Sequence, residues 1–209
     1  QRIHSLAQQI GSADGLDFRG ILSHAGNGYA AQSRSEALEI AEQERLSMCG
    51  VKEKLEEAGV AVPEVSVGAT PTVLAADSFD GITEIRPGNY AFLDLLPVKV
   101  GVAALSDVSL TVLATVISRN AQYFVTDAGS KTLTSDAGVH GMSGTSGFGM
   151  AYPEDCFLDP DAALRVDKVS EEHGMIHRGG YALDIGDRVR IIPNHACPVA
   201  NLATAYHVV

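Results

Sequence analysis

A histidine and a cysteine stand two positions apart near the end of the chain, at His195 and Cys197, in the run RVRIIPNHACPVANL. The β-branched residues before them predict a strand, and side chains two positions apart on a strand point to the same face. An imidazole nitrogen and a thiolate sulfur together suit zinc or a similar divalent cation. Two protein ligands leave positions open for water or substrate, as a Lewis-acid catalyst requires. The alternative is that Cys197 is a small buried hydrophobe and His195 ends a strand.

Three loops in the first half of the chain are rich in glycine and follow predicted strands. Their candidate ligand-binding residues are His24 in HAGNGY, Gly68, Ala69 and Thr70 in GATPT, and Arg86, Gly88 and Asn89 in RPGNY. Ligands of parallel α/β folds bind at the carboxyl ends of the strands, where backbone N–H groups are exposed. Two neighbouring strand ends of this kind indicate a phosphate held between them, although each loop alone is more typical of an ordinary turn.

The elements that position these loops alternate between strand and helix over residues 1–96. Apolar runs predict strands at 18–23, 60–67 and 82–85. A helix is predicted from a cap at Ser33 or Ser35 to Ala58, with Gly59 as its stop. Strand, helix and strand in this order imply parallel pairing. Because three strands cannot close a barrel, we expect either an open sheet or, preferably, part of a (β/α)8 barrel whose other strands precede Gln1.

Residues 97–209 have a different pattern, with β-rich runs separated by turn residues. Strands are predicted at 108–118, 122–127, 163–170 and 187–193, without a helical stripe of useful length. We therefore expect an antiparallel β domain, a small barrel or sandwich, that carries the His195–Cys197 pair. The Gly/Ser-rich segment 138–155 is predicted to be a loop, flexible or arranged around a ligand.

Composition excludes several classes of protein. The net charge is −11, from 15 basic and 26 acidic residues, and no cluster of Lys and Arg offers a surface for nucleic acid or anionic membrane. The three cysteines, Cys49, Cys156 and Cys197, are odd in number and widely spaced, which is typical of a reducing compartment such as the cytoplasm. No apolar run approaches the length of a membrane span.

Seven motifs in order resemble the D-threonine aldolase and eukaryotic-type D-serine dehydratase family, which are pyridoxal-phosphate (PLP) enzymes of the alanine-racemase-like fold. They are HAGNGY, VSVGATPT, EIRPGNYAFLD, VLATVISR, TDAGSKTLTSD, EEHG and GDRVRIIPNHACP. The resemblance implies the second half of a PLP-binding (β/α)8 barrel followed by the β domain. It implies a cofactor phosphate near Gly68 to Thr70, Gly88 and Asn89, and a divalent metal, zinc or manganese, on His195 and Cys197.

Other roles follow more loosely from the resemblance. Arg86 matches an arginine beside the pyridine nitrogen, where it would keep that nitrogen unprotonated, and a histidine like His24 lies near the same ring. His173 in EEHG is expected either to approach the metal or, more often in such a position, to be a structural histidine. Asp127 is expected to shape a turn by accepting backbone N–H bonds.

The chain departs from the family pattern in one respect. Family members hold PLP through a lysine on the first barrel strand, which would lie upstream of Gln1. The five lysines present, Lys52, Lys54, Lys99, Lys131 and Lys168, do not match that position. We therefore expect the chain to be part of a longer protein, and to be inactive by itself.

The function implied is a metal- and PLP-dependent lyase of D-β-hydroxy amino acids, active as a homodimer. Aldol cleavage to glycine and an aldehyde is favoured over dehydration to a keto acid and ammonia. One metal position could serve both reactions. Two alternatives from other classes are a non-catalytic binding or assembly module, and a racemase, in which the metal pair would have no role.

Overall fold

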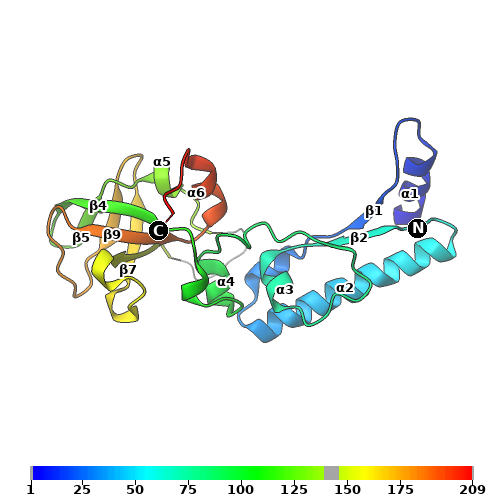
Figure 1. Cartoon of the computed structure of the whole chain (residues 1–209), viewed down its shortest axis with the longest axis horizontal. Coiled ribbons are helices and arrows are strands. Elements are labelled where there is room, and N and C mark those ends of the chain that lie inside the picture. The colour runs from blue at the N-terminus through cyan, green and yellow to red at the C-terminus, as the bar shows by residue number, and fades with distance from the viewer. Residues whose placement is uncertain (1, 139–145, 209) are drawn as a thin grey trace. The chain divides into compact units, whose positions relative to one another are not determined.

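The computed structural model describes residues 2–138 and 146–208. The chain divides into two compact units, residues 1–88 and residues 89–209, which are described separately. Figure 1 shows the first with α1, α2, α3 and a small sheet, and the second with β4 to β9 and α4 to α6.

The first unit is built on a three-stranded parallel sheet of order β1–β2–β3. Its strands are β1 (Gly20–Leu22), β2 (Glu64–Val67) and β3 (Glu84–Ile85). Ile21 pairs with Val65, and Val67 pairs with Ile85. The parallel pairing predicted from the sequence is confirmed, although each strand is shorter than the apolar run that predicts it.

The long helix α2 (Arg34–Glu57) packs along this sheet (Figure 1). It starts where the sequence predicts, because the Ser33 hydroxyl accepts a hydrogen bond from Glu36 N at 3.2 Å. Gly59 ends it with a positive φ of 81°, a conformation that favours glycine. Its buried residues are Ala37, Ala41, Met48 and Leu55.

The core of the first unit lies between α2, β2 and the first helix, α1 (Arg2–Ser12). It contains Ala7, Met48, Leu55, Val62, Val65 and Val67. Burial of these side chains on one face of the sheet fixes the strand register, and therefore the positions at which the strands end.

The second unit is a closed antiparallel barrel of six strands in the order β4–β5–β8–β7–β6–β9. The strands are β4 (Val112–Arg119), β5 (Tyr123–Thr126), β6 (Gly149–Pro153), β7 (Leu164–Val169), β8 (Gly174–His177) and β9 (Arg188–Pro193). Val116, Phe124, Val166, Ile176, Val189 and Ile191 fill its core with no solvent exposure. The predicted antiparallel β domain is therefore confirmed as a barrel.

Two of these strands, β6 and β8, are not predicted from the sequence. Part of the segment 138–155, predicted to be a loop, is strand β6, whereas residues 139–145 lie outside the described residues. A Cβ on Gly149 would lie 2.6 Å from Ile192 O, and a Cβ on Gly174 would lie 2.6 Å from Ala128 O. These glycines permit close approach of backbones within a strand, so their presence does not indicate a loop.

Short helices also occur in the second unit, where the sequence predicts none of useful length. They are α4 (Leu95–Val100), α5 (Ser130–Leu133) and α6 (Ala196–Leu202). None of the described helices is long and apolar enough to cross a membrane.

Candidate functional site

The three strand ends of the first unit lie next to one another, as the sequence predicts. The backbone N–H of Ala25, which follows His24, donates to Gly68 O at 3.1 Å. Arg86 N donates to Val67 O at 2.9 Å. Parallel pairing therefore brings the residues after β1, β2 and β3 to one edge of the sheet.

Gly68 is required by close packing at this edge. A Cβ on Gly68 would lie 2.9 Å from Arg86 O, which is closer than side chains tolerate. Ala69 and Thr70 then lead into the short helix α3 (Thr70–Ala75), with a proline in its first turn. By contrast, nothing lies within 4 Å of a Cβ built on Gly88, so the chain leaves open space there.

The guanidinium of Arg86 is held by neighbours on the sheet. Its Nε donates to Ser66 Oγ at 2.7 Å, and its Nη2 donates to Ser23 O. The hydroxyl of Ser66 in turn donates to a carboxylate oxygen of Glu84. This Glu84–Ser66 support was not predicted, although strand pairing places Ser66 opposite Glu84.

His24 lies immediately beyond β1 and beside Tyr29, with 6.0 Å between the ring centroids. Tyr29 belongs to the 3-10 helix η1 (Gly26–Ala30). His24 is exposed to solvent at the same edge of the sheet as Gly68 and Arg86.

Asn89 belongs to the second unit, where its side chain donates from Nδ2 to Asp94 Oδ2 at 2.6 Å. The sequence predicts phosphate binding through the backbone N–H of Asn89, which this side-chain contact does not test. The amide of Asn89 therefore connects the RPGNY turn to Asp94.

The His195–Cys197 pair lies at the junction between a strand and a helix, not along a strand. Strand β9 ends at Pro193, His195 is the N-cap residue of α6, and Cys197 lies in the first helical turn. Alternation of strand side chains is therefore the wrong reason for grouping the two residues. The two residues flank Ala196, at which the helix begins.

A carboxylate orients the imidazole of His195. Its Nδ1 lies 2.8 Å from Asp136 Oδ2, and the His195 side chain is 23% exposed. When Nδ1 carries the proton for this contact, the lone pair of Nε2 is left for another ligand. A histidine that donates one ring N–H to a carboxylate is the usual arrangement behind a metal ligand.

The thiol of Cys197 is free and its residue is exposed. Partial burial of the group raises its pKa, and the nearby Asp94 carboxylate raises it further. A thiol held protonated in this way is a poor nucleophile by itself, and a bound cation would favour its ionised form.

Asp94 is fully buried and accepts hydrogen bonds from both of the flanking helices. Its Oδ1 accepts from Leu96 N at 3.0 Å, and its Oδ2 accepts from Ala196 N at 2.8 Å. Burial raises the pKa of this carboxyl group, and the hydrogen bonds from Ala196 and Leu96 oppose that effect. Asp94 and Asp136 were not among the predicted site residues, although Asp94 ends the motif EIRPGNYAFLD and Asp136 ends the motif TDAGSKTLTSD.

Asn194, next to the pair, holds two distant stretches of chain together. Its Nδ2 donates to Ala137 O at 2.8 Å and to Gly147 O at 2.9 Å. Because Ala137 follows Asp136, this buried amide also helps to place the carboxylate that contacts His195.

Two other predictions for the second unit have different outcomes. Asp127 accepts a hydrogen bond from Thr115 N at 2.8 Å, as predicted for a residue that shapes the backbone. His173 lies between β7 and β8. Residues 2–138 and 146–208 hold no group of three or more His, Cys, Asp or Glu arranged to bind one ion, so His173 does not form such a group with His195 and Cys197. Any ion on His195 and Cys197 would therefore keep open positions.

None of the five lysines follows a strand of the parallel sheet. Lys52 and Lys54 lie in α2, and Lys99 lies in α4. Lys131 pairs with Glu172, while Lys168 Nζ lies 5.4 Å from the centre of the Tyr123 ring.

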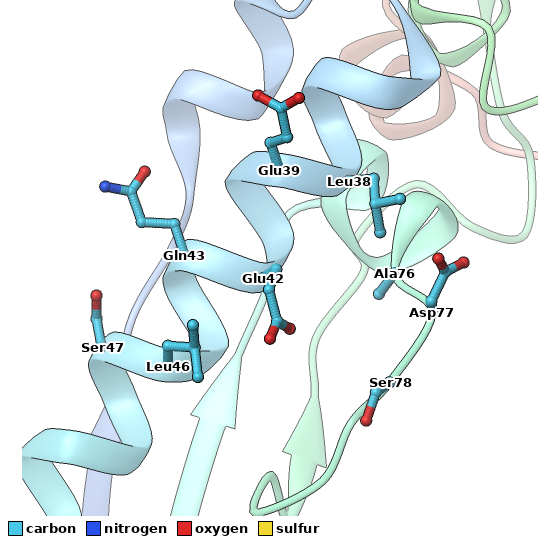
Figure 2. A pocket seen from close by; sticks show the side chains of 9 residues that line it. All are labelled: Leu38, Glu39, Glu42, Gln43, Leu46, Ser47, Ala76, Asp77 and Ser78. Carbon is cyan, nitrogen blue, oxygen red and sulfur yellow. The ribbon is translucent and has the colours of Figure 1, made fainter.

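An open groove of about 700 Å³ lies on the surface of α2, lined also by the segment after α3 (Figure 2). Leu38, Leu46 and Ala76 form its apolar surface, and Glu39, Glu42 and Asp77 contribute carboxylates. It contains no basic side chain and none of the predicted site residues, so it does not have the chemistry of a phosphate site.

The fold of the first unit and the barrel of the second define a chain of the alanine-racemase-like class. Residues 1–95 match the family model "Alanine racemase, N-terminal domain", and residues 109–209 match the family model "Putative serine dehydratase domain". The chain belongs to the family of D-threonine aldolases and eukaryotic-type D-serine dehydratases, which share this fold.

Relatives with assigned activities include both dehydratases and an aldolase. D-threo-3-hydroxyaspartate dehydratase of Delftia sp. is 37% identical over 92% of this chain and 53% of its own length. D-serine dehydratase of Dictyostelium discoideum is 33% identical over 93% of this chain and 51% of its own length. D-threonine aldolase of Arthrobacter sp. is 29% identical over 95% of this chain and 49% of its own length. The chain therefore spans about half the length of these relatives.

Solved structures support the same relationship. An alanine-racemase-like protein of Idiomarina loihiensis is 33% identical, with a TM-score of 0.85 over 96% of this chain and 54% of that one. The Delftia dehydratase has also been solved as a variant with a histidine replaced, and as a variant with a cysteine two positions later replaced, the latter described as metal-free. His195 and Cys197 have the same spacing.

Proposed function

We propose that the full-length protein is a PLP- and divalent-metal-dependent lyase of D-β-hydroxy amino acids. The observation that carries this proposal is the His195–Cys197 pair, with Asp136 on the imidazole of His195. The same spacing of histidine and cysteine in the Delftia dehydratase, and the metal-free state of its cysteine variant, support a metal function for the pair.

The donor set suits zinc or manganese. Nε2 of His195 and Sγ of Cys197 would hold the ion, and Asp136 would keep the imidazole in the required tautomer. An ion with open positions supplies a Lewis acid that polarises a substrate oxygen.

The strand ends of the first unit suit the phosphate of PLP. Gly68, Ala69 and Thr70 form a turn of small residues that leads from β2 into α3, although all three are buried, and the space at Gly88 would admit an anion after β3. We propose that Asn89 contributes through its backbone, because its side chain is bonded to Asp94. Bound PLP supplies an electron sink for bond cleavage at the carbon that bears the amino group.

Arg86 and His24 would lie beside the pyridine ring. Ser66 and Ser23 hold the Arg86 guanidinium in place, and a guanidinium that donates a hydrogen bond to the ring nitrogen does not give up its proton. Arg86 would thereby leave that nitrogen unprotonated. We infer that the lysine holding the cofactor lies outside these 209 residues, so that the chain alone would be inactive.

Dehydration is a second candidate for the reaction, beside the aldol cleavage favoured by the sequence. The Delftia and Dictyostelium dehydratases are 37% and 33% identical, against 29% for the Arthrobacter aldolase. In both reactions the substrate would carry an amino group, which the cofactor would bind, and a β-hydroxyl group, which the metal would bind.

The homodimer and the cytoplasmic location stay predictions.

Product analysis of the full-length protein tests the proposal. The protein with added PLP and Zn²⁺ or Mn²⁺ is incubated with D-threonine, D-serine and D-threo-3-hydroxyaspartate. Glycine with an aldehyde would show aldol cleavage, and a keto acid with ammonia would show dehydration. A protein that gains no visible absorbance with PLP, and forms neither set of products, would be a binding or assembly module. Interconversion of D- and L-alanine without metal would indicate a racemase.

A further inference from the structure

Asp94 is a buried carboxylate for which the proposed reaction has no direct use. Only 1% of the residue is exposed. The hydrogen bond from Leu96 N to Asp94 is local, because Asp94 is the N-cap of α4. The hydrogen bond from Ala196 N, by contrast, joins residues 102 positions apart in the sequence. A carboxylate so far from solvent is stabilised by the N–H groups that it accepts.

The contact with Ala196 replaces the ordinary cap of α6. His195 occupies the N-cap position of this helix, but its side chain makes no capping hydrogen bond and its Nδ1 contacts Asp136 instead. Asp94 Oδ2 accepts the N–H of Ala196, the first residue of the helix, at 2.8 Å. A carboxylate from a distant part of the chain therefore caps α6, and the imidazole of His195 is left available.

The capped N–H belongs to the single residue between the two predicted metal ligands. If the start of α6 shifts, His195 and Cys197 move relative to each other, because one leads into the helix and the other lies in its first turn. Metal sites lose affinity when the groups that orient their ligands are removed.

We propose that Asp94 is the positioning residue of the metal site, fixing the separation of His195 and Cys197 by holding the N–H of Ala196. The inference rests on the proposed metal function of that pair. Asp94 does not touch the ion; it acts through the backbone. Asn89 supports it, because its Nδ2 donates to the same oxygen at 2.6 Å.

A purely structural role would have a different signature. If Asp94 only stabilised the packing around α4 and α6, its loss would lower the melting temperature but leave the metal affinity of the folded protein unchanged. Metal affinity, and the environment of the metal-bound thiolate, therefore separate the two roles without any assay of turnover.

Two substitutions remove the contact from opposite sides. Asp94→Ala removes the carboxylate and leaves the N–H of Ala196 without its acceptor. Ala196→Pro removes the N–H itself, and proline is tolerated at the first position of a helix. The extended backbone of His195, with φ −138° and ψ 108°, is compatible with a following proline.

Asp107→Ala is the matched control. Asp107 also lies in the second unit, and its carboxylate accepts from Ala104 N at 2.8 Å in a local turn. This turn does not involve α6 and Asp107 has no proposed role in the site, so its loss tests the general effect of removing a capping carboxylate.

The experiment titrates the full-length, metal-free protein with Co²⁺, followed by competition with Zn²⁺ and a chelator, with thermal unfolding as a check of folding. We expect wild type and Asp107→Ala to bind Co²⁺ alike and to show a thiolate-to-cobalt absorption band. We expect Asp94→Ala and Ala196→Pro to lose about tenfold or more in affinity and to change that band. If one of the two fails to fold, the other decides.

Wild-type affinity and an unchanged band in a folded Asp94→Ala or Ala196→Pro protein would overturn the inference while leaving the metal proposal intact. Absence of Co²⁺ and Zn²⁺ binding by wild type would overturn both.

Discussion

Nδ1 of His195 lies 2.8 Å from Oδ2 of Asp136, although 59 residues separate the two in sequence. The carboxylate takes one ring nitrogen of the histidine and leaves the other for a ligand. This contact distinguishes His195 from a histidine that merely ends a strand, and it gives the strongest structural support for a metal function of the pair.

Asp136→Asn should therefore weaken metal binding while leaving the fold intact. The amide can still approach Nδ1, but it lacks the negative charge that makes the imidazole a better ligand, so we expect a loss of about ten- to a hundredfold in Zn²⁺ affinity. Competition with a chelator measures this. Asp161→Asn, at an exposed position of the same unit, is the control; equal affinities for the two variants would contradict the role of Asp136.

Cys197→Ala should abolish metal-dependent turnover of the full-length protein. Loss of the thiolate leaves one protein ligand, which is too few to hold an ion firmly. PLP binding, followed by its absorbance, should be largely unchanged. Cys156→Ala is a matched control, because Cys156 is also a free cysteine of the second unit. Unchanged turnover in Cys197→Ala would remove the metal pair from the mechanism.

Zn²⁺ affinity should rise with pH. Burial and the charge of Asp94 raise the pKa of Cys197, so the thiol holds its proton at neutral pH and the ion must displace it. Below the thiol pKa, each pH unit should raise affinity by about tenfold from this proton alone, and the rise should stop above that pKa. Chelator competition at several pH values, with Cys197→Ser as the comparison, measures this. Equal slopes for the two proteins would contradict it.

Gly88→Val should weaken PLP binding by about tenfold or more, equivalent to roughly 1.4 kcal/mol. Apart from its two neighbours in sequence, no atom of residues 2–138 or 146–208 lies within 4 Å of a Cβ built at Gly88, so that carbon clashes with none of them. A loss of affinity would therefore report obstruction of the phosphate. Gly180→Val, at an equally open position of the second unit, should bind PLP as wild type does. Wild-type affinity in Gly88→Val would place the phosphate elsewhere.

Local signals in the sequence predicted much of the fold. The Ser33 cap and the apolar stripe of α2 locate the helix, and apolar runs locate β1, β2 and β3, of which β2 is the strand that is mostly buried. β6 escaped detection because its glycine permits close contact with β9, and that contact is long-range.

The site was predicted less completely, for a physical reason. His195 and Cys197 carry their chemistry in their own side chains, so spacing reveals them. The contacts that link Asp136 and Asp94 to the site reach partners 59 and 102 residues away, which no local pattern encodes. The strand geometry assumed for the pair was wrong because a helix begins at Ala196.

The metal content of the purified full-length protein tests the central claim most directly. After incubation with Zn²⁺ and removal of excess metal, wild type should retain one ion per chain. The double substitution of His195 and Cys197 by alanine should retain none while folding normally. Equal metal content in the two proteins, or none in wild type, would contradict the account.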